Sequence, residues 1–308
     1  MSGMSATTDG KQILVLRQSN EYAVFVGDFS ANPPRIANIR RLTLDDKTDF
    51  PHAWTPDSRA VIFESNRYGN NYAIFKQSVD KRTAEPIVVT PFPEVLPQMA
   101  PDGHWVLYRT WAPGERYSNS KLMRVPLEGG TPEEVPIGEP LDEFRCALNA
   151  GTRCVLRTTV PGKYYAFYDL DPVRGKSREL ARAKWMLGVL GDWGVSPDGT
   201  QIAFPDHSSR DARIRVVDLE QRPGQPKEHD VVAQGLANLS SANFSADGRG
   251  WFISVETTVG NRLFYLNGDG ASRPLGDIPG LALPSPDGRH VAFLNQIVAA
   301  NAWEFARR

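Results

Sequence analysis

A short turn frame recurs along this chain and constrains its fold more than any other feature. It consists of Thr or Ser, Pro, Asp and a small residue, followed by alternating apolar residues, as in WTPDSRAVIFESNR at 54–67 and VSPDGTQIAFPDHS at 195–208. The repeated turn position, found every 40–49 residues, is held by Asp9, Asp57, Asp102, Ala150, Asp198, Asp247 and Asp287. A fixed period of about 40–50 residues with strands in every unit is typical of a β-propeller.

Each unit divides into four short strands. In 49–90 the segments FPHAW, RAVIFES, YAIFKQSV and EPIVVT are rich in β-formers, and the polar stretches TPDS and NRYGNN separate them. Pro and Gly, with 24 and 26 residues, interrupt every unit, and no segment favours a long helix. We therefore predict an all-β chain that forms one β-propeller domain over 1–308, with four-stranded blades and a WD-like period.

The blade count follows from the number of turns. Seven turns predict seven blades, and six blades are the alternative, which would leave one unit outside the ring. The first unit has only a few residues before its turn at Asp9, and the last unit has no fourth strand after NAWEFARR. We expect unpaired strand edges at this seam, which makes it the weakest part of the ring. Because the start cuts into a repeat, we also expect the chain to be a piece of a longer protein.

The Asp residues of the frame have a sufficient structural explanation. A tight hairpin joins the first two strands of a blade, and its turn needs a residue that tolerates positive φ and a side chain that satisfies free amides. We therefore expect a folding role, not a catalytic one, for the Asp residues of these turns, and we expect them in equivalent turns on one face of the ring.

The repeats resemble a known family. SPDGTQIAF with RIRVVDL, and TPDSRAVIF with YAIFKQSV, are similar to the Pro-Asp-Gly repeats of TolB-like β-propellers over nearly the whole chain. The longer strings, such as YDLDPVRGKSRELAR and PSPDGRHVAFLNQIVAANAWEF, resemble propeller regions that follow serine/threonine kinase or winged-helix modules in bacterial sensor proteins. This resemblance implies a sensing or interaction module and carries over no catalytic residue.

Motifs of other functional classes are missing from the sequence. GVSPDG around Ser196 has Asp198 where a hydrolase nucleophile elbow needs Gly, and there is no kinase signature, HExxH or CxxC. The net charge of −1 and scattered Lys and Arg argue against nucleic-acid binding. No 18-residue apolar run and no signal peptide are present, so we expect no membrane segment in this chain. The compartment stays open, and an extracytoplasmic one would suit a part of a membrane sensor.

The two cysteines flank the degenerate turn at Ala150. Hairpin pairing around this turn would place Cys146 opposite Cys154, which permits a disulfide. We favour free thiols, because cysteine is commonly a small buried hydrophobe. Neither reading decides the redox compartment.

The first strand of each blade should line a central channel, so the residues just before each turn should converge. We predict a ligand-binding site at the channel mouth that comprises Phe50, His52, Gln98, Arg145, Trp193 and Asn243. The simpler alternative is that these polar groups only hydrate a water-filled channel. We expect no metal and no cofactor.

The function predicted from the sequence is therefore non-catalytic binding. The chain would bind a protein or a small-molecule ligand at the channel mouth, as a monomer and as the sensory or interaction part of a larger bacterial regulator. The alternative is a propeller enzyme, a hydrolase or lyase that uses channel acids, His and Arg. The test for the alternative is whether Asp49, His52, Arg145 and Asp192 meet within hydrogen-bond reach.

Overall fold

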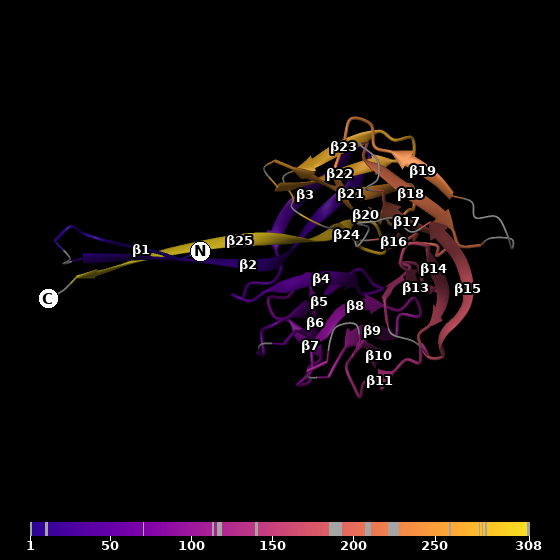
Figure 1. The fold of residues 1–308 in the computed structure, drawn as a ribbon, viewed down its shortest axis with the longest axis horizontal. Helices are drawn as coiled ribbons and strands as arrows, with labels where there is room; N and C mark the ends of the chain where they lie inside the picture. Colours follow the sequence, from indigo (N-terminus) through magenta and orange to yellow (C-terminus); the bar gives the residue numbers. More distant parts are fainter. Residues whose placement is uncertain are drawn as a thin grey trace.

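The chain is a single all-β propeller. The computed structural model describes residues 2–9, 12–69, 71–112, 114–115, 119–138, 141–184, 193–206, 211–220, 228–258, 260–276, 278, 280 and 282–306. In this part of the chain six antiparallel sheets, built from strands β1 to β25, are arranged around a central axis (Figure 1). The fold class and the four-stranded blades are as predicted.

Five blades are made of consecutive strands that follow one another outward from this axis. Blade I comprises β4 (Asp49–Trp54), β5 (Ala60–Ser65), β6 (Ala73–Ser78) and β7 (Glu85–Val88). Blade II comprises β8 (Glu94–Met99), β9 (Trp105–Thr110), β10 (Lys121–Pro126) and β11 (Glu133–Glu134). Blade III comprises β12 (Glu143–Cys146), β13 (Cys154–Val160), β14 (Tyr164–Asp171) and β15 (Gly175–Lys184).

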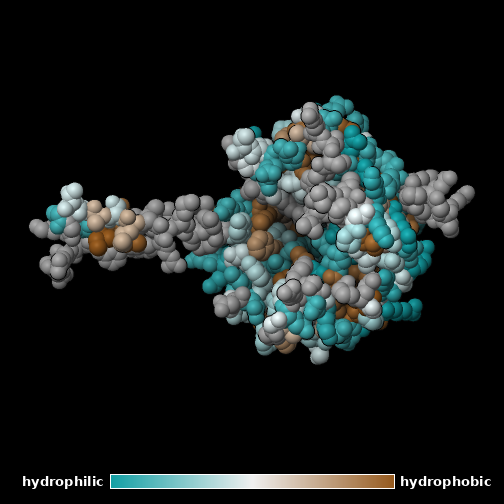
Figure 2. Space-filling view, in the orientation of Figure 1, coloured by the Kyte–Doolittle hydropathy of each residue, from teal (hydrophilic) through white to brown (hydrophobic). Residues whose placement is uncertain are grey.

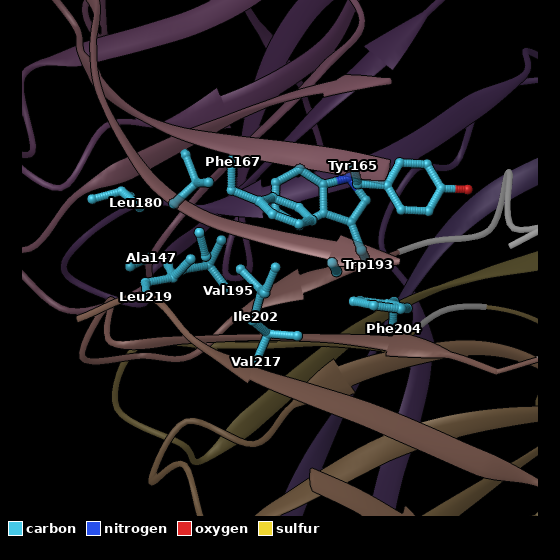
Figure 3. Packing of buried hydrophobic residues seen from close by; sticks show 13 residues of the cluster. Ala147, Tyr165, Phe167, Leu180, Trp193, Val195, Ile202, Phe204, Val217 and Leu219 are labelled. Atoms are coloured by element: carbon cyan, nitrogen blue, oxygen red, sulfur yellow. The ribbon is translucent and has the colours of Figure 1, made fainter. Parts of the chain in front are cut away.

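Blades IV and V repeat this arrangement. Blade IV comprises β16 (Gly194–Val195), β17 (Gln201–Pro205), β18 (Arg213–Asp218) and β19 (Glu228–Val232). Blade V comprises β20 (Leu239–Phe244), β21 (Gly250–Thr257), β22 (Gly260–Asn267) and β23 (Ser272–Gly276). Apolar residues of adjacent blades pack against each other. In one such cluster Tyr165 and Phe167 of blade III pack with Ile202 and Phe204 of blade IV (Figure 3).

Blade VI closes the ring with both ends of the chain. Its two inner strands are β24 (Ala282–Pro284) and β25 (His290–Ala306), and its two outer strands are β2 (Gln12–Ala31) and β3 (Pro34–Arg41). β2 and β25 pair without interruption from Gln12↔Ala306 to Asp28↔His290. Val24 and Val26 of β2 pack in one apolar cluster with residues of blade I. The expectation of unpaired edges at the seam is therefore wrong. The C-terminal end of the chain supplies the two inner strands of blade VI and the N-terminal end supplies its two outer strands, so the two incomplete units complete one blade.

The structure has six blades, so the preferred count of seven is wrong and the alternative is confirmed. The additional copy of the frame is the first one in the sequence, at Asp9. It also forms a turn, but this turn joins β1 (Ser2–Ala6) to β2 outside the ring. There Thr7 Oγ1 donates to Asp9 Oδ1 at 2.6 Å and Gln12 N donates to Thr7 Oγ1 at 3.1 Å. The Ser245–Asp247 turn of blade V has the same bonds at the same lengths. The frame specifies a hairpin, and a hairpin need not belong to a blade.

The extra hairpin forms part of an arm that projects from the ring. β1 pairs with β2 from Ser2↔Arg17 to Ala6↔Ile13, and β25 pairs with the other edge of β2 along the same stretch. Figure 1 shows these three strands leaving the propeller as a long ribbon that carries the two termini.

The Asp residues of the blades occupy equivalent turns between the first and second strands, as predicted. The Asp carboxylate accepts the preceding Ser or Thr hydroxyl in the turns of Asp57, Asp198, Asp247 and Asp287. Asp102, which follows Ala100, accepts the amides of His104 and Trp105 instead.

Neighbouring turns also touch one another. Gly103 has φ +74°, and a Cβ atom built on it would lie 3.2 Å from the Pro56 ring of the previous turn. Where the other blades have Gly, blade I has Ser58 at φ 61°. Its Oγ accepts the Asp287 amide of blade VI at 3.0 Å. The turns therefore form a ring of contacts at one end of the channel, and Ser58 joins the last turn to the first.

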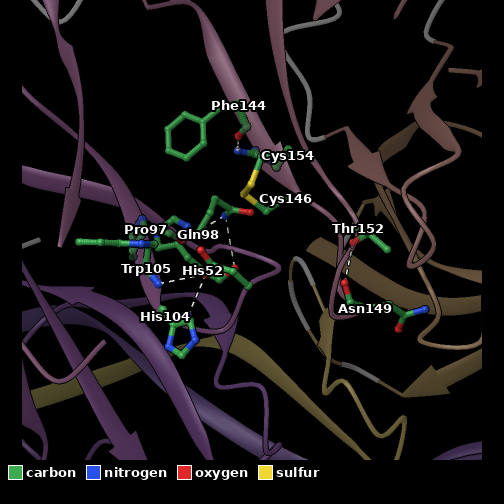
Figure 4. Close-up of a disulfide and its surroundings, with 12 residues drawn as sticks. His52, Pro97, Gln98, His104, Trp105, Phe144, Cys146, Asn149, Thr152 and Cys154 are labelled. Carbon is green, nitrogen blue, oxygen red and sulfur yellow. Dashed lines mark hydrogen bonds between the residues drawn. A yellow bond between two sulfur atoms is a disulfide. The ribbon is translucent and has the colours of Figure 1, made fainter. Parts of the chain in front are cut away.

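The preferred reading of the cysteines is also wrong. Cys146 and Cys154 form a disulfide between directly opposite residues of β12 and β13 (Figure 4). The degenerate turn leaves the hairpin register intact, so the two Cβ atoms meet as the hairpin geometry permits.

Candidate functional site

The inner strands of the six blades enclose a cavity of about 530 Å³. Apolar residues and prolines make up most of its described wall, and Figure 2 shows apolar side chains around the hollow in the middle of the ring. The wall includes residues of every inner strand and residues of the turns, such as Pro56, Pro101, Pro197 and Pro286. The cavity thus reaches the end of the channel where the turns meet.

Five of the six predicted site residues line this one cavity: Phe50, His52, Gln98, Arg145 and Asn243. They come from blades I, II, III and V, and they lie up to 193 positions apart in the sequence. Convergence of inner strands therefore brings them together.

Trp193 is the exception. Its side chain is 1% exposed, packs edge-on against Phe167 at 5.7 Å between ring centres, and lies in the core between blades III and IV (Figure 3). Its Nε1 donates to Glu143 Oε2 at 2.6 Å. Trp193 cannot stack on a ligand from this position, because β16 begins only at Gly194 and the residue before it turns into the core.

Backbone carbonyls hold Arg145 at the channel wall. Its Nε donates to the Trp193 carbonyl at 3.3 Å and its Nη1 donates to the Phe144 carbonyl at 3.1 Å. The guanidinium also lies 5.9 Å from the centre of the Trp193 ring. These contacts fix the position of the guanidinium at the channel wall.

His52 faces a carboxylate that the sequence did not point to. His52 Nε2 lies 3.2 Å from Glu64 Oε2, and the same oxygen accepts the Leu96 amide at 2.7 Å. Leu96 has φ 54° within a β-bulge, and it lines the cavity. Glu64 of blade I thereby holds in place the part of the cavity wall that Leu96 of blade II forms. Sequence reasoning missed it because it lies on β5, the second strand, among residues that alternate like any buried strand.

The two amide side chains bridge neighbouring blades. Gln98 Nε2 donates to the Pro97 carbonyl at 3.1 Å and reaches the His52 carbonyl at 3.5 Å. Asn243 Nδ2 donates to the Ala282 carbonyl of blade VI at 3.1 Å. Both residues therefore help to space the inner strands as well as to line the cavity.

Two carboxylates, Asp49 at the start of β4 and Glu64 on β5, lie near Phe50. Burial and the nearby carboxylates of Glu64 and Asp49 raise the pKa of Tyr72, whose ring lies 5.9 Å from that of Phe50. Asp49 is fully buried, and Arg67 Nη2 donates to it at 3.1 Å.

The groups proposed for acid–base chemistry have separate partners. Asp49 pairs with Arg67, His52 with Glu64, and Arg145 with backbone carbonyls. No ion pair or hydrogen bond joins these three to one another in the described part of the chain, and Asp192 lies outside it. The described residues also contain no group of three or more His, Cys, Asp or Glu that could hold a metal ion.

Comparison with solved structures gives the fold an independent reference. A putative TolB from Agrobacterium tumefaciens superposes with a TM-score of 0.64 at 14% identity, over 91% of this chain and 99% of that one. The chain has the fold of the TolB β-propellers. TolB from Acinetobacter baumannii matches with a TM-score of 0.55 at 16% identity, over 89% of this chain and 64% of that one.

Part of an enzyme structure also matches this chain. A puromycin hydrolase matches this TolB-like chain with a TM-score of 0.53 at 14% identity, over 93% of this chain but only 47% of the hydrolase. No protein-family model and no curated protein matches the sequence. Among the described residues no helix is both long and apolar enough to span a membrane.

Proposed function

We propose that this chain is a non-catalytic binding module that takes a ligand into its channel. The observation that supports the proposal is a cavity of about 530 Å³ on which residues from six blades converge. Its volume lies within the range of about 300–1,000 Å³ that is usual for ligand pockets, and its wall combines apolar surface with a few placed polar groups.

The charges on the wall select for an anionic group on the ligand. Among the described wall residues, Arg145 is the one Arg or Lys, and Asp102 is the one carboxylate. Asp102 is already engaged by two amides of its own turn. A ligand with an apolar body and a carboxylate or phosphate would therefore place its anion at Arg145, whose planar fork suits both groups.

The wider role that we propose is the sensory or interaction part of a larger bacterial regulator. The support for this role is the resemblance of the repeat strings to propeller regions of bacterial sensor proteins. We prefer binding to the hydrolase or lyase alternative because Asp49, His52 and Arg145 each have a different partner.

Titration of wild type, Arg145→Gln and Arg273→Gln with a panel of small apolar carboxylates and phosphate esters tests the proposal. Arg273, exposed on the outer strand β23, is the matched control. We expect Arg145→Gln to weaken binding at least about tenfold, since a hydrogen bond to a charged group contributes about 1.5–3 kcal/mol. Arg273→Gln should bind like wild type. Binding that both variants leave unchanged would move the site away from the channel.

A further inference from the structure

The first hairpin of blade III lacks the hydrogen bonds that close the other turns. Ala150 stands at the position of the turn Asp, and Leu148 at that of the Ser or Thr. The remaining side-chain bond is that of Thr152 Oγ1 to the Asn149 carbonyl at 2.6 Å. Among the described residues no carboxylate accepts the amides of this turn, so the hairpin lacks the side-chain support that Asp gives the other turns.

The disulfide lies where this support is missing. Cys146 and Cys154 are the last directly opposite pair of β12 and β13, and the Ala147 amide bonds to the Arg153 carbonyl one step nearer the turn. The covalent bond closes the same hairpin at its strand pair, four residues before the position that Asp holds in the other turns.

The two sulfur-bearing residues differ in access. Cys154 is 0% exposed and packs in an apolar cluster with Leu107, Leu122 and Phe144. Cys146 is only partly buried and lines the channel cavity. A small molecule in the cavity can therefore reach the disulfide from the side of Cys146.

We infer that Cys146 is a site of thiol–disulfide exchange for low-molecular-mass thiols that enter the channel. An incoming thiolate attacks Cys146 Sγ, a new S–S bond forms between the two, and the bond to Cys154 breaks. Cys154 leaves as the thiolate and takes up a proton. The thiolate of a second thiol molecule then attacks the mixed disulfide at the sulfur of the first thiol and releases Cys146 as a thiolate. The two small thiols are thereby oxidised to their disulfide, and the protein disulfide is reduced.

Exchange at Cys146 would change the rim of the cavity. Leu148, Asn149 and Ala150 line the cavity, and they belong to the loop that the disulfide closes. The same loop is tied to both neighbouring turns, because the Asn149 amide bonds to the Pro197 carbonyl and the Gly151 amide to the Pro101 carbonyl. Opening the disulfide loosens this part of the rim and adds a thiol adduct to the wall. The inference depends on the cavity and the disulfide alone, so its failure would leave the proposed ligand binding untouched.

The decisive experiment maps the adduct. The full chain is incubated with glutathione under native conditions, quenched in acid and analysed by peptide mass spectrometry. We expect the adduct on Cys146 to exceed that on Cys154 at least tenfold, with Cys154 as the free thiol. An adduct on Cys154, equal adducts on both, no reaction of the native chain, or cysteines that are free from the outset would each overturn the inference.

Two controls test the route and the asymmetry. A thiol attached to a large polyethylene glycol cannot enter the cavity and should react at least tenfold more slowly, and an equal rate would overturn entry through the channel. Iodoacetamide should label Cys154→Ser, which leaves Cys146, at least tenfold faster than Cys146→Ser, which leaves Cys154. Equal labelling of two folded variants would overturn the asymmetry, and if either variant does not fold, adduct mapping on the wild type still decides.

Discussion

Glu94 makes the stability of this propeller depend on pH near neutrality. The side chain is 1% exposed at the start of β8, and burial raises its pKa from 4.5 to about 7. Thr90 Oγ1 donates to Oε1, whereas Oε2 is buried and has no hydrogen-bond partner among the described residues. The carboxyl is therefore neutral in the folded chain at pH values where it is ionised in the unfolded chain.

The sign and size of the effect follow from the two pKa values. Between pH 4.5 and 7 the folded state binds more protons at Glu94 than the unfolded state, so stability falls as pH rises through this window. At 1.36 kcal/mol per pKa unit, ionisation costs the folded state about 2–3 kcal/mol between pH 5 and pH 8. Glu94→Gln removes the ionisation and should remove this part of the pH dependence.

Urea unfolding at pH 5, 6, 7 and 8 measures the effect. We expect the free energy of unfolding of wild type to fall by about 2–3 kcal/mol more than that of Glu94→Gln over this range. The slope with pH decides, not the absolute stability, because a buried Gln amide has its own desolvation cost. Glu85→Gln is the matched control, since Lys81 lowers the pKa of the exposed Glu85 and keeps its titration below this window. Equal slopes for wild type and Glu94→Gln would refute the reasoning.

Two further predictions follow from the turns and the arm. Asp198→Ala should lower the free energy of unfolding by about 1–2 kcal/mol in urea, because the carboxylate accepts bonds from Ser196 and Thr200. Burial raises the pKa of Asp198, but these bonds lower it further, so its net pKa lies below 3.8. The stabilisation should therefore be complete above about pH 4 and should decline as pH falls through the lowered pKa, where the difference between wild type and variant should shrink. Lost ligand binding at unchanged stability would contradict the folding role. In hydrogen exchange, amides of 2–9 in the arm should exchange faster than those of 24–28, where β2 lies within blade VI, and equal protection would contradict this order.

The repeat period predicted the fold, but it could not predict the blade count. The frame around Asp9 makes the same local hydrogen bonds as the frame around Asp247. Whether such a hairpin enters the ring depends on the pairing of β2 with β25, which lie at opposite ends of the chain. Long-range pairing leaves no trace in a window of a dozen residues, so a count of turns overestimates the blades by one.

The convergence of the candidate residues on one cavity was predictable as far as the inner strands determine it. Residues before each turn line the channel, and Arg145 and His52 lie there for that reason. Trp193 has the same sequence position relative to its turn but lies in the core, because the inner strand of its blade begins only after it, at Gly194. Glu64 could not be found from the sequence, since its role depends on contact with Leu96 of the next blade.

If the proposed ligand binding is right, residues at the rim of the channel contribute to both stability and binding, whereas other residues contribute to only one of them. The prolines of the frame both shape their turns and line the cavity, so changes to them would affect folding and ligand contacts together. Asp102 also lines the cavity, whereas Asp198 does not, although both close equivalent turns. Asp198 therefore reports on the turn alone, and Arg145 on the inner wall. Variants at these two positions would separate the folding role of the turns from the proposed binding role of the inner wall.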